Sequence, residues 1–442
     1  MPTKSGRSRW QRLPRVLRWL YPGLRVKRWL LLLLLGLVVV SFGVAFAIGL
    51  GTMVEVTDAV SRVVGASLAS RASAVVGVAL IAGGLCAVVL SLAQIVHSIA
   101  EPLRERENRA LVDVLLADRV RPRGPSVVAI GGGTGLSNLL RGLKRHTSDI
   151  TAIAAVSDEG GSSGRLRREM DTLPPGDVRN CLVALADDEA IMGRLLQYRF
   201  EDVPSVNGHS LGNLFIVALA SITGDFERAV KETSKVLAIR GRVLPATLDH
   251  VVLCARLQDG ATVRGETEVS AHGGAIERVF LDPERPEGLP EAVEAIGAAD
   301  IVVLGPGSTY TSLIPNLLVP GVAEALRRSN AIRVFVCNVM TQPRETDLLL
   351  EASDQVRVVL AHAGGKVFDY VLINDAVPSA GVLSRYESVG ARIVHADAEE
   401  VGRMGLIPIC GDLISDDIYA WHDPDRLAQA ILRLRPVGEP VV

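Results

Sequence analysis

The chain has 442 residues, a mass of 47.1 kDa, a formal net charge of −2 and a pI near 6.5. This length is sufficient for a large core and for more than one structural part. Because no overall positive charge exists to attract a polyanion, nucleic acid is not expected among the partners. The five cysteines are scattered, without Cys-x-x-Cys or Cys/His spacing, which argues against a zinc site and a disulfide framework.

The first part of the chain is strongly basic and then strongly apolar. Residues 1–28 hold nine Lys or Arg and no acid, and the uncharged stretches 30–50 and 72–96 follow. Each stretch is long enough to cross a bilayer of roughly 30 Å as a helix. Because Lys and Arg favour the cytoplasmic side, we expect a two-helix transmembrane hairpin within residues 1–100, with both chain ends in the cytoplasm. A cleaved signal peptide ending at Ala45-Phe46-Ala47 is the alternative, but a second apolar stretch follows it.

A juxtamembrane segment, 101–125, joins this hairpin to a globular domain. We expect a helix from Glu101 to Asp118 and a Pro/Gly-rich linker after it. Strands and helices alternate along the domain at 126–442, which predicts an α/β fold with a doubly wound, mostly parallel sheet, a helical insert and a small β-rich insert. The predicted strands are 126–130, 150–156, 300–304, 332–337, 356–360, 369–373 and 392–395; the predicted helices are 135–145, 290–297, 309–327 and 424–433; the inserts are 163–239 and 250–281.

Four of these strands run directly into polar segments, and three of the segments are rich in glycine. In open parallel sheets, ligands bind beyond the carboxyl ends of the strands. Bare backbone amides and small hydroxyls at such ends suit a phosphorylated ligand. The candidates are Gly131, Gly132, Gly133, Thr134, Gly135, Gly305, Gly307 and Ser308 for phosphate or sugar groups, with Asn338, Thr341 and Gln342 for a base or sugar edge.

The glycine segment after the first strand does not match a standard nucleotide fingerprint. Leu136 occupies the third glycine position of G-x-G-x-x-G, and no Gly-Lys-Ser/Thr follows as in a P-loop. The alternative interpretation is a tight strand-to-helix turn that glycine permits.

Further polar candidates lie after the second strand and in the helical insert. Asp158 follows a strand, where a carboxylate can hold a ribose hydroxyl or a metal ion. Asp177 is expected to cap the helix that it precedes. His209 and Asn213 share one helical face, and Ser210 or His209 is the expected cap of their helix. The remaining candidates are Gly161, Ser162, Ser163, Arg165, Arg179 and Asn180.

These motifs, taken in order, closely resemble the gluconeogenesis factor family, the bacterial relatives of 2-phospho-L-lactate transferase. The resemblance covers 126–375 and leaves the first 125 residues outside it. The matching segments are Gly-Gly-Gly-Thr-Gly-Leu at 131–136, Gly-Gly-Ser-Ser-Gly-Arg-Leu-Arg at 160–167, Pro-Pro-Gly-Asp-Val-Arg-Asn at 174–180, Gly-His-Ser-Leu-Gly-Asn at 208–213, Arg-Gly-Arg-Val-Leu-Pro-Ala at 240–246, Gly-Pro-Gly-Ser at 305–308 and Asn-Val-Met-Thr-Gln at 338–342.

The resemblance implies a cytoplasmic domain that binds a UDP-sugar such as UDP-N-acetylglucosamine and supports cell shape and wall synthesis during gluconeogenic growth. Tyr386 is then the expected partner of the uracil ring and Trp421 a weaker candidate, with ordinary packing as the alternative for both. Two residues depart from the family pattern, Glu159 in place of an Asp and Arg344 in place of a Gly. The expected partners are the UDP-sugar or another phosphorylated small molecule, the membrane and, in a homo-oligomer, further copies of the chain.

Two functions remain open from the sequence. The first is a membrane-tethered regulatory module that binds a UDP-sugar. The second, which the resemblance also implies, is a magnesium-dependent transferase acting on a deazaflavin alcohol, with Asp158, Asp177 and His209 as catalytic candidates and Asp158, Glu159 or Asp177 holding Mg²⁺. The sequence contains no evident Ser-His or Cys-His nucleophile, which favours binding over covalent catalysis.

Overall fold

The computed structural model describes residues 27–48, 66–104, 124–187, 189–201, 205–272, 276–343, 345, 349–415 and 419–436. The chain divides into two compact units, 1–121 and 122–442, which are described separately here. Of the predicted juxtamembrane helix, 101–104 is helical, and its remainder lies outside the described residues.

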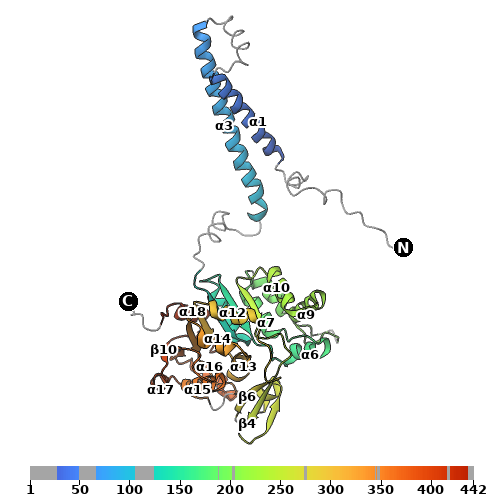
Figure 1. Cartoon of the computed structure of the whole chain (residues 1–442), viewed down its shortest axis with the longest axis vertical. Helices are drawn as coiled ribbons and strands as arrows, with labels where there is room; N and C mark the ends of the chain where they lie inside the picture. The colour runs from blue at the N-terminus through green and yellow to red at the C-terminus, as the bar shows by residue number, and fades with distance from the viewer. Residues whose placement is uncertain are drawn as a thin grey trace, which may run out of the picture. The chain divides into compact units, whose positions relative to one another are not determined.

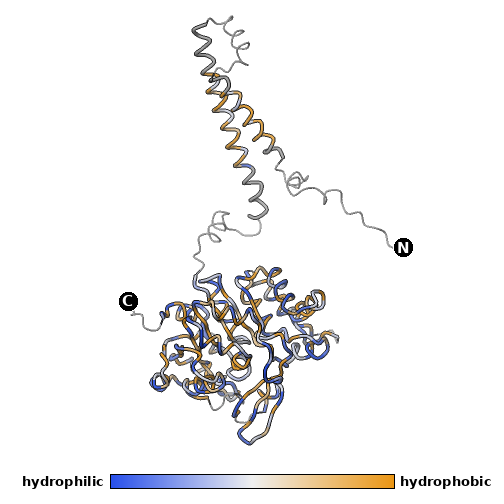
Figure 2. The backbone as a smooth tube through the Cα atoms, viewed as in Figure 1, coloured by the Kyte–Doolittle hydropathy of each residue, from blue (hydrophilic) through white to orange (hydrophobic). Residues whose placement is uncertain are grey.

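The N-terminal unit contains two helices, α1 (Lys27–Ile48) and α3 (Ala66–Arg104), which pack side by side in opposite directions (Figure 1). Their described middle parts are largely apolar (Figure 2), and side chains such as Leu31 and Val75 are more than half exposed. One described stretch, Val75–Gln94, is long and apolar enough to cross a membrane, whereas the apolar part of α1 is shorter, Leu31–Val44. The structure therefore contains a helix pair, and the crossing of a membrane by both helices stays a prediction.

Glycines allow the two helices to approach each other closely. A Cβ atom on Gly84 would lie 2.6 Å from Val40 Cγ2 and 2.9 Å from the Gly36 carbonyl oxygen. The neighbouring Gly83 has open space at the same position. Small residues in one helix face are what close helix packing requires in an apolar environment.

The C-terminal unit is built on a seven-stranded parallel sheet with the order β10-β9-β8-β7-β1-β2-β3. Several strands are buried along their whole length, as their nearly continuous apolar sequences predict for strands covered on both faces. The strands are β1 (Val127–Gly131), β2 (Ile150–Ala154), β3 (Arg242–Pro245), β7 (Ile301–Leu304), β8 (Ile332–Val336), β9 (Tyr370–Asn374) and β10 (Ile407–Gly411).

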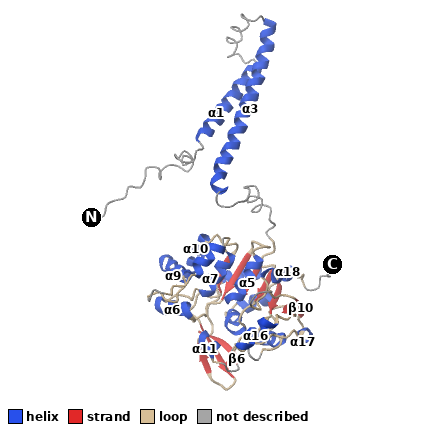
Figure 3. Cartoon of the chain, turned by 180° about the vertical axis from the view of Figure 1, so that it is seen from behind, coloured by secondary structure: helices blue, strands red, loops and turns tan. Residues whose placement is uncertain are grey.

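Helices cover both faces of this sheet, as the doubly wound prediction requires. α12 (Pro290–Ala298) and α14 (Val322–Arg328) lie on the face toward the viewer in Figure 1, and α5 (Gly133–Leu143) and α18 (Pro424–Leu432) lie on the other face, seen in Figure 3. From β1 the chain builds β2 and β3 on one side and returns to build β7 to β10 on the other. This reversal opens a crevice at the carboxyl ends of β1 and β7.

Both predicted inserts are present. The helical insert follows β2, and the β-rich insert is a separate three-stranded antiparallel sheet with the order β5-β4-β6 and one short helix. The elements are α6 (Gly161–Met170), α7 (Gly176–Leu185), α8 (Glu189–Gln197), α9 (Leu211–Thr223) and α10 (Phe226–Val236), then β4 (Val252–Leu257), β5 (Thr262–Arg264), α11 (Glu266–Ala271) and β6 (Ile276–Asp282).

Several predicted elements differ in the structure. The helix predicted at 309–327 is divided into a π-helical turn η4 (Thr309–Leu313), α13 (Ile314–Leu318) and α14, because Pro320 and Gly321, with φ 91°, interrupt it. Residues 392–395 form only isolated bridges instead of a strand. The prediction also missed β3, β10, α16 (Ala380–Ser388) and α17 (Ala398–Arg403).

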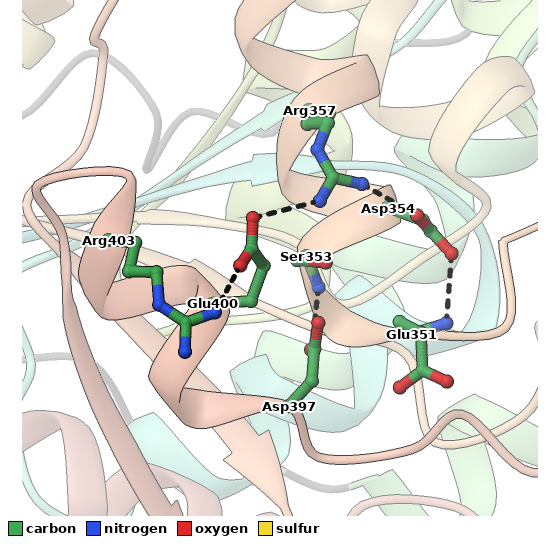
Figure 4. Close-up of polar contacts among 7 residues, drawn as sticks. All are labelled: Glu351, Ser353, Asp354, Arg357, Asp397, Glu400 and Arg403. Atoms are coloured by element: carbon green, nitrogen blue, oxygen red, sulfur yellow. Dashed lines mark hydrogen bonds and ion pairs between the residues drawn. The ribbon is translucent and has the colours of Figure 1, made fainter.

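The strand predicted at 356–360 is wrong, because these residues belong to helix α15 (Ala352–Ala363). Valine favours strands, but Val356 and Val359 are fully buried on the helix face that packs on the core. The start of the helix is stabilised by Asp397, whose carboxylate accepts a hydrogen bond from the Ser353 N–H at 2.9 Å (Figure 4). Asp397 lies 44 residues further along the chain, so no local pattern could reveal this contact.

One ion pair between α15 and α17, together with one pair within each helix, reinforces the same junction. Arg357 pairs with Asp354 at 2.8 Å and with Glu400 at 3.3 Å, and Arg403 pairs with Glu400 at 2.7 Å (Figure 4). These side chains are partly exposed, so each pair contributes little by itself and the buried valines contribute more.

A matched pair of glycine variants tests the packing of α5 against α18. A Cβ on Gly142 of α5 would overlap the Pro424 carbonyl group, whereas Gly297 of α12 has open space. Since alanine is about 1 kcal/mol more favourable than glycine within helices, Gly297→Ala should keep or raise the Tm of residues 122–442. Gly142→Ala should lower it by roughly 5 °C or more, because the overlap outweighs that gain. Thermal unfolding followed by circular dichroism measures both, and equal behaviour of the two variants would contradict the close α5–α18 contact.

Candidate functional site

A cavity of about 350 Å³ lies at the carboxyl ends of β1, β7 and β8, where the chain order reverses. This volume is in the range of small-molecule sites. Predicted ligand-binding residues from four separate segments line it together, which are Gly132, Gly133, Thr134, Gly135, Gly307, Ser308, Asn338, Thr341, Gln342 and Tyr386. Loops that are far apart in the sequence thus converge on one crevice.

The N-terminus of α5 forms part of the crevice wall, and a residue from another helix caps it. Its N-cap, Gly132, has no side chain to supply a hydrogen bond. Instead, Asp177 Oδ1 accepts a hydrogen bond from the Gly133 N–H at 2.8 Å. The expectation that Asp177 caps α7 is therefore wrong: α7 has Pro175 at its N-cap, and Asp177 is its second residue.

The glycines of this turn are required for different reasons. Gly133 has φ +65°, a left-handed conformation that favours glycine. A Cβ on Gly132 would overlap the Asp177 carboxylate, and one on Gly135 would lie 2.5 Å from the Pro306 carbonyl oxygen. Packing between loops of the protein thus accounts for Gly132 and Gly135, whereas the left-handed Gly133 fits the tight-turn alternative. Gly131 ends β1, and its carbonyl oxygen accepts a hydrogen bond from Asn316 Nδ2.

The loop after β7 is fixed to the end of β8. Asn338 Nδ2 donates to the Gly307 carbonyl oxygen at 2.8 Å, and its Oδ1 accepts from the Gly307 N–H at 3.3 Å. Ser308 donates to the buried carboxylate of Glu345 and accepts from the Thr311 N–H at 3.2 Å. The side-chain amide of Asn338 thus positions the loop as well as lining the cavity, and Gly305, with φ +85°, forms the turn behind it.

Aromatic side chains form the other end of the crevice. Tyr386 of α16 is partly buried, packs on a small apolar cluster with Met340 and Ile414, and receives a hydrogen bond from the Ala420 backbone. Trp421 also lines the cavity but is 51% exposed, and its ring stacks on Tyr419 with centroids 5.0 Å apart. The two predicted aromatic candidates therefore share one wall, where each also has a packing role.

The remaining predicted residues form a second group around the starts of α6, α7 and α9. Arg179 is 8% exposed, and its guanidinium donates to Ser210 Oγ at 2.6 Å, to Asn213 Oδ1 at 2.9 Å and to Asn180 Oδ1 at 2.8 Å. This network joins α7 to α9. Ser210 is the N-cap of α9, as expected, and accepts from the Asn213 N–H at 3.2 Å.

His209 forms a buried pair with Ser162 that the sequence did not reveal. Ser162 Oγ lies 2.9 Å from His209 Nδ1 and accepts from Asn213 Nδ2 at 3.0 Å. Burial and the nearby Arg165 guanidinium lower the pKa of His209. A Ser-His contact therefore exists, contrary to expectation, but both residues are over 95% buried and neither lines the cavity.

Other members of this second group have simpler roles. Ser163 is buried close to the Asn213 amide, Gly161 adopts φ +46° at the start of α6, and Arg165 donates to the Asn207 carbonyl oxygen. Glu159 pairs with Arg167 at 3.6 Å. Arg344, the other departure from the family pattern, lies outside the described residues.

Carboxylate side chains lie close together between the crevice and the second group of residues around α6, α7 and α9. Burial, together with repulsion from the nearby Asp158, raises the pKa of Asp177 to about 7. Burial and repulsion from Asp158 likewise raise the pKa of Glu266, which the β-rich insert supplies, to about 7. A Cβ on Gly176 would lie 2.8 Å from Asp158 Oδ2, so glycine leaves room for this carboxylate. In the ranges that the structure describes, no group of three or more His, Cys, Asp or Glu side chains is arranged as a metal site.

Several residues of the crevice were not singled out from the sequence. They are Asn138 and Ser312 on the helices that follow β1 and β7, Pro306 and Met340 in the loops, and His422 directly before α18. Asp423 and Pro424 signal a helix start, and this signal explains the correct prediction of α18. This helix signal does not indicate that His422 lies beside the carboxyl ends of β1 and β8.

Comparison with known proteins identifies the class. Residues 127–414 match the family model described as 2-phospho-L-lactate transferase CofD. The gluconeogenesis factor of Bacillus subtilis is 46% identical over 316 residues, which cover 70% of this chain and 98% of that protein. A homologue from Nostoc sp. is 45% identical over 419 residues, covering 94% of this chain and 92% of that one.

Solved structures agree with this assignment. The crystal structure of protein BH3568 from Bacillus halodurans superposes with a TM-score of 0.68 at 46% identity, covering 70% of this chain and 99% of that chain. It is described as a member of the UPF0052 family. This chain therefore belongs to the gluconeogenesis factor family, which confirms the resemblance seen in its sequence motifs and the mostly parallel α/β fold.

The raised pKa of Asp177 makes a prediction for Asp177→Asn. The pKa is 3.8 for an ordinary Asp and about 7 in the folded protein. Between these values the folded state holds more protons than the unfolded state, so the free energy of unfolding falls as the pH rises through this window, by at most about 4 kcal/mol. Asn keeps an acceptor for the Gly133 N–H but does not titrate. Relative to the parent, Asp177→Asn should therefore gain stability between pH 4 and pH 8.

Urea unfolding of residues 122–442 at several pH values measures this difference. Asp171→Asn is the matched control, because the Asp171 side chain is fully exposed. A parallel pH dependence of the parent and Asp177→Asn would contradict the buried, repelled carboxylate.

Proposed function

We propose that the crevice binds the diphosphate and base of a UDP-sugar. The observation that carries this proposal is the convergence of the α5 N-terminus, the Gly307-Ser308 loop and the Tyr386 wall on one cavity. Helix N-termini and exposed backbone amides favour phosphate groups. An aromatic ring at the far end of the same cavity offers a stacking surface for a uracil ring.

The proposal includes a role and a location. As a membrane-tethered member of its family, the protein would support cell shape and wall synthesis during growth on gluconeogenic carbon sources. The N-terminal helix pair supplies the tether: its outward side chains are apolar and exposed, which a lipid environment would cover. In this arrangement both spans cross the membrane, and both chain ends and the C-terminal unit are cytoplasmic. A homo-oligomer belongs to the same proposal.

A transferase of the 2-phospho-L-lactate type is the second candidate, and the carboxylates near Gly133 favour it. Mg²⁺ is commonly held by one or two carboxylates together with substrate phosphates. Asp158 and Asp177 repel each other, so a cation between them would relieve that repulsion, while Glu159 pairs with Arg167. When bound, Mg²⁺ would neutralise charge on the phosphate groups. Turnover with Mg²⁺, a phospholactyl donor and a deazaflavin alcohol, absent in Asp158→Asn, would establish this activity.

Isothermal titration calorimetry of residues 122–442 with UDP and UDP-N-acetylglucosamine tests the binding proposal. This unit is a suitable sample, because relatives such as the Bacillus subtilis protein match over about its length and over 98% of their own. We expect saturable binding. Tyr386→Leu should weaken it roughly 5- to 100-fold, since stacking of one base contributes about 1–3 kcal/mol.

Tyr198→Leu is the matched control for Tyr386→Leu. Tyr198 is 55% exposed and lies outside the crevice, where it contacts Phe200. Its replacement should leave the dissociation constant unchanged. If the parent unit gives no heat with either ligand, the proposal is wrong.

Cell fractionation tests the tether. The full chain should sediment with membranes and resist extraction by high salt, whereas residues 122–442 should be found in the soluble fraction, because the apolar helices would be missing. An alkaline phosphatase reporter, which is active outside the cytoplasm, should be active when fused at residue 57 and inactive at the C-terminus. The reverse pattern would contradict the proposed topology.

A further inference from the structure

Hydrogen bonds of the His422 carbonyl oxygen and of the next residue, Asp423, fix the position of His422 in the crevice. Its carbonyl oxygen accepts a hydrogen bond from Asn138 Nδ2 of α5. The next residue, Asp423, is the N-cap of α18 and accepts from the N–H groups of Asp425 at 2.9 Å and Arg426 at 2.8 Å. The backbone at His422 is therefore positioned by α5 and α18, and the residue lines the cavity.

The two ring nitrogens of His422 have different environments. The Cys337 backbone hydrogen-bonds the ring. Nε2 is buried and has no hydrogen-bond partner among the described residues, so the bonded nitrogen is Nδ1. A carbonyl oxygen only accepts, so Nδ1 carries the proton and Nε2 presents a lone pair. Burial lowers the pKa of His422 to about 4, which keeps the ring neutral near pH 7.

A half-buried histidine, His362, shows what this nitrogen lacks. His362 Nδ1 lies 2.7 Å from the Val358 carbonyl oxygen, as His422 Nδ1 pairs with Cys337. Its Nε2, however, accepts a hydrogen bond from the Val279 N–H at 3.0 Å. The missing partner of His422 is therefore a donor group, N–H or O–H. An unpaired buried acceptor is costly, and sites that carry one commonly receive the partner from a ligand or water.

We infer that His422 Nε2 accepts a hydrogen bond from an N–H or O–H group of the ligand in the crevice. This inference rests on the proposed nucleotide binding and adds a specificity residue to it. In uridine diphosphate the donor is either the imide N–H of the uracil ring or a hydroxyl of the ribose. Both are neutral donors that match a neutral imidazole acceptor.

Calorimetry of the full chain in detergent, with UDP as the probe, tests the assignment. His422→Asn keeps a donor close to the position of Nδ1 and removes the Nε2 acceptor. We expect UDP to bind roughly 10- to 100-fold more weakly to this variant, the effect of leaving one buried donor unpaired. His362→Asn is the matched control, and it should lower the Tm without changing the dissociation constant.

Two analogues identify the donor without any mutation. The donor is the imide N–H if N3-methyl-UDP binds the parent more weakly than UDP does, and if His422→Asn binds N3-methyl-UDP as well as the parent does. The donor is a ribose hydroxyl if 2′,3′-dideoxy-UDP gives this pattern instead. Unchanged UDP affinity in His422→Asn, or a loss that neither analogue reproduces, overturns the assignment. If the parent does not bind UDP, both this inference and the proposed function are wrong. If the parent binds UDP and His422→Asn binds it equally well, only this inference is wrong.

Discussion

The hydrogen bond from the Gly133 N–H to the Asp177 carboxylate is the constraint on which the site depends. It joins the first turn after β1 to the start of α7, two segments 44 residues apart in the sequence. It also places the Asp177 carboxyl group at the N-terminus of α5, where the helix dipole offsets part of the cost of a buried charge. Without this contact, the N-terminus of α5 would have no side-chain cap.

Most polar groups at the crevice hold its own loops together. Asn338 pairs with both backbone groups of Gly307, Ser308 pairs with Glu345, and Arg179 joins three side chains of the neighbouring network. Polar residues that suggest ligand contacts in the sequence are thus largely used for preorganisation. Preorganisation of this kind lowers the cost of binding, since few groups need to be ordered when the ligand arrives.

The architecture of the sheet and the place of the crevice could be predicted because they depend on local signals. Apolar strands followed by glycine turns identify β1, β2 and β7, and the reversal of chain order then places the cavity. Helix α15 was mistaken for a strand because its valines favour strands, although the Glu351 N–H donates locally to Asp354 at its start. The true partner of Asp177 and the return of His422 to the crevice could not be predicted, since both depend on tertiary contacts.

The two ends of the crevice differ in how firmly they are anchored. The glycine turns lie over fully buried strands, whereas α16, which carries Tyr386, has no fully buried residue. Local displacement costs least where few apolar contacts must be broken. The aromatic wall is consequently the more adjustable side of the site, because a movement of α16 would break few buried contacts.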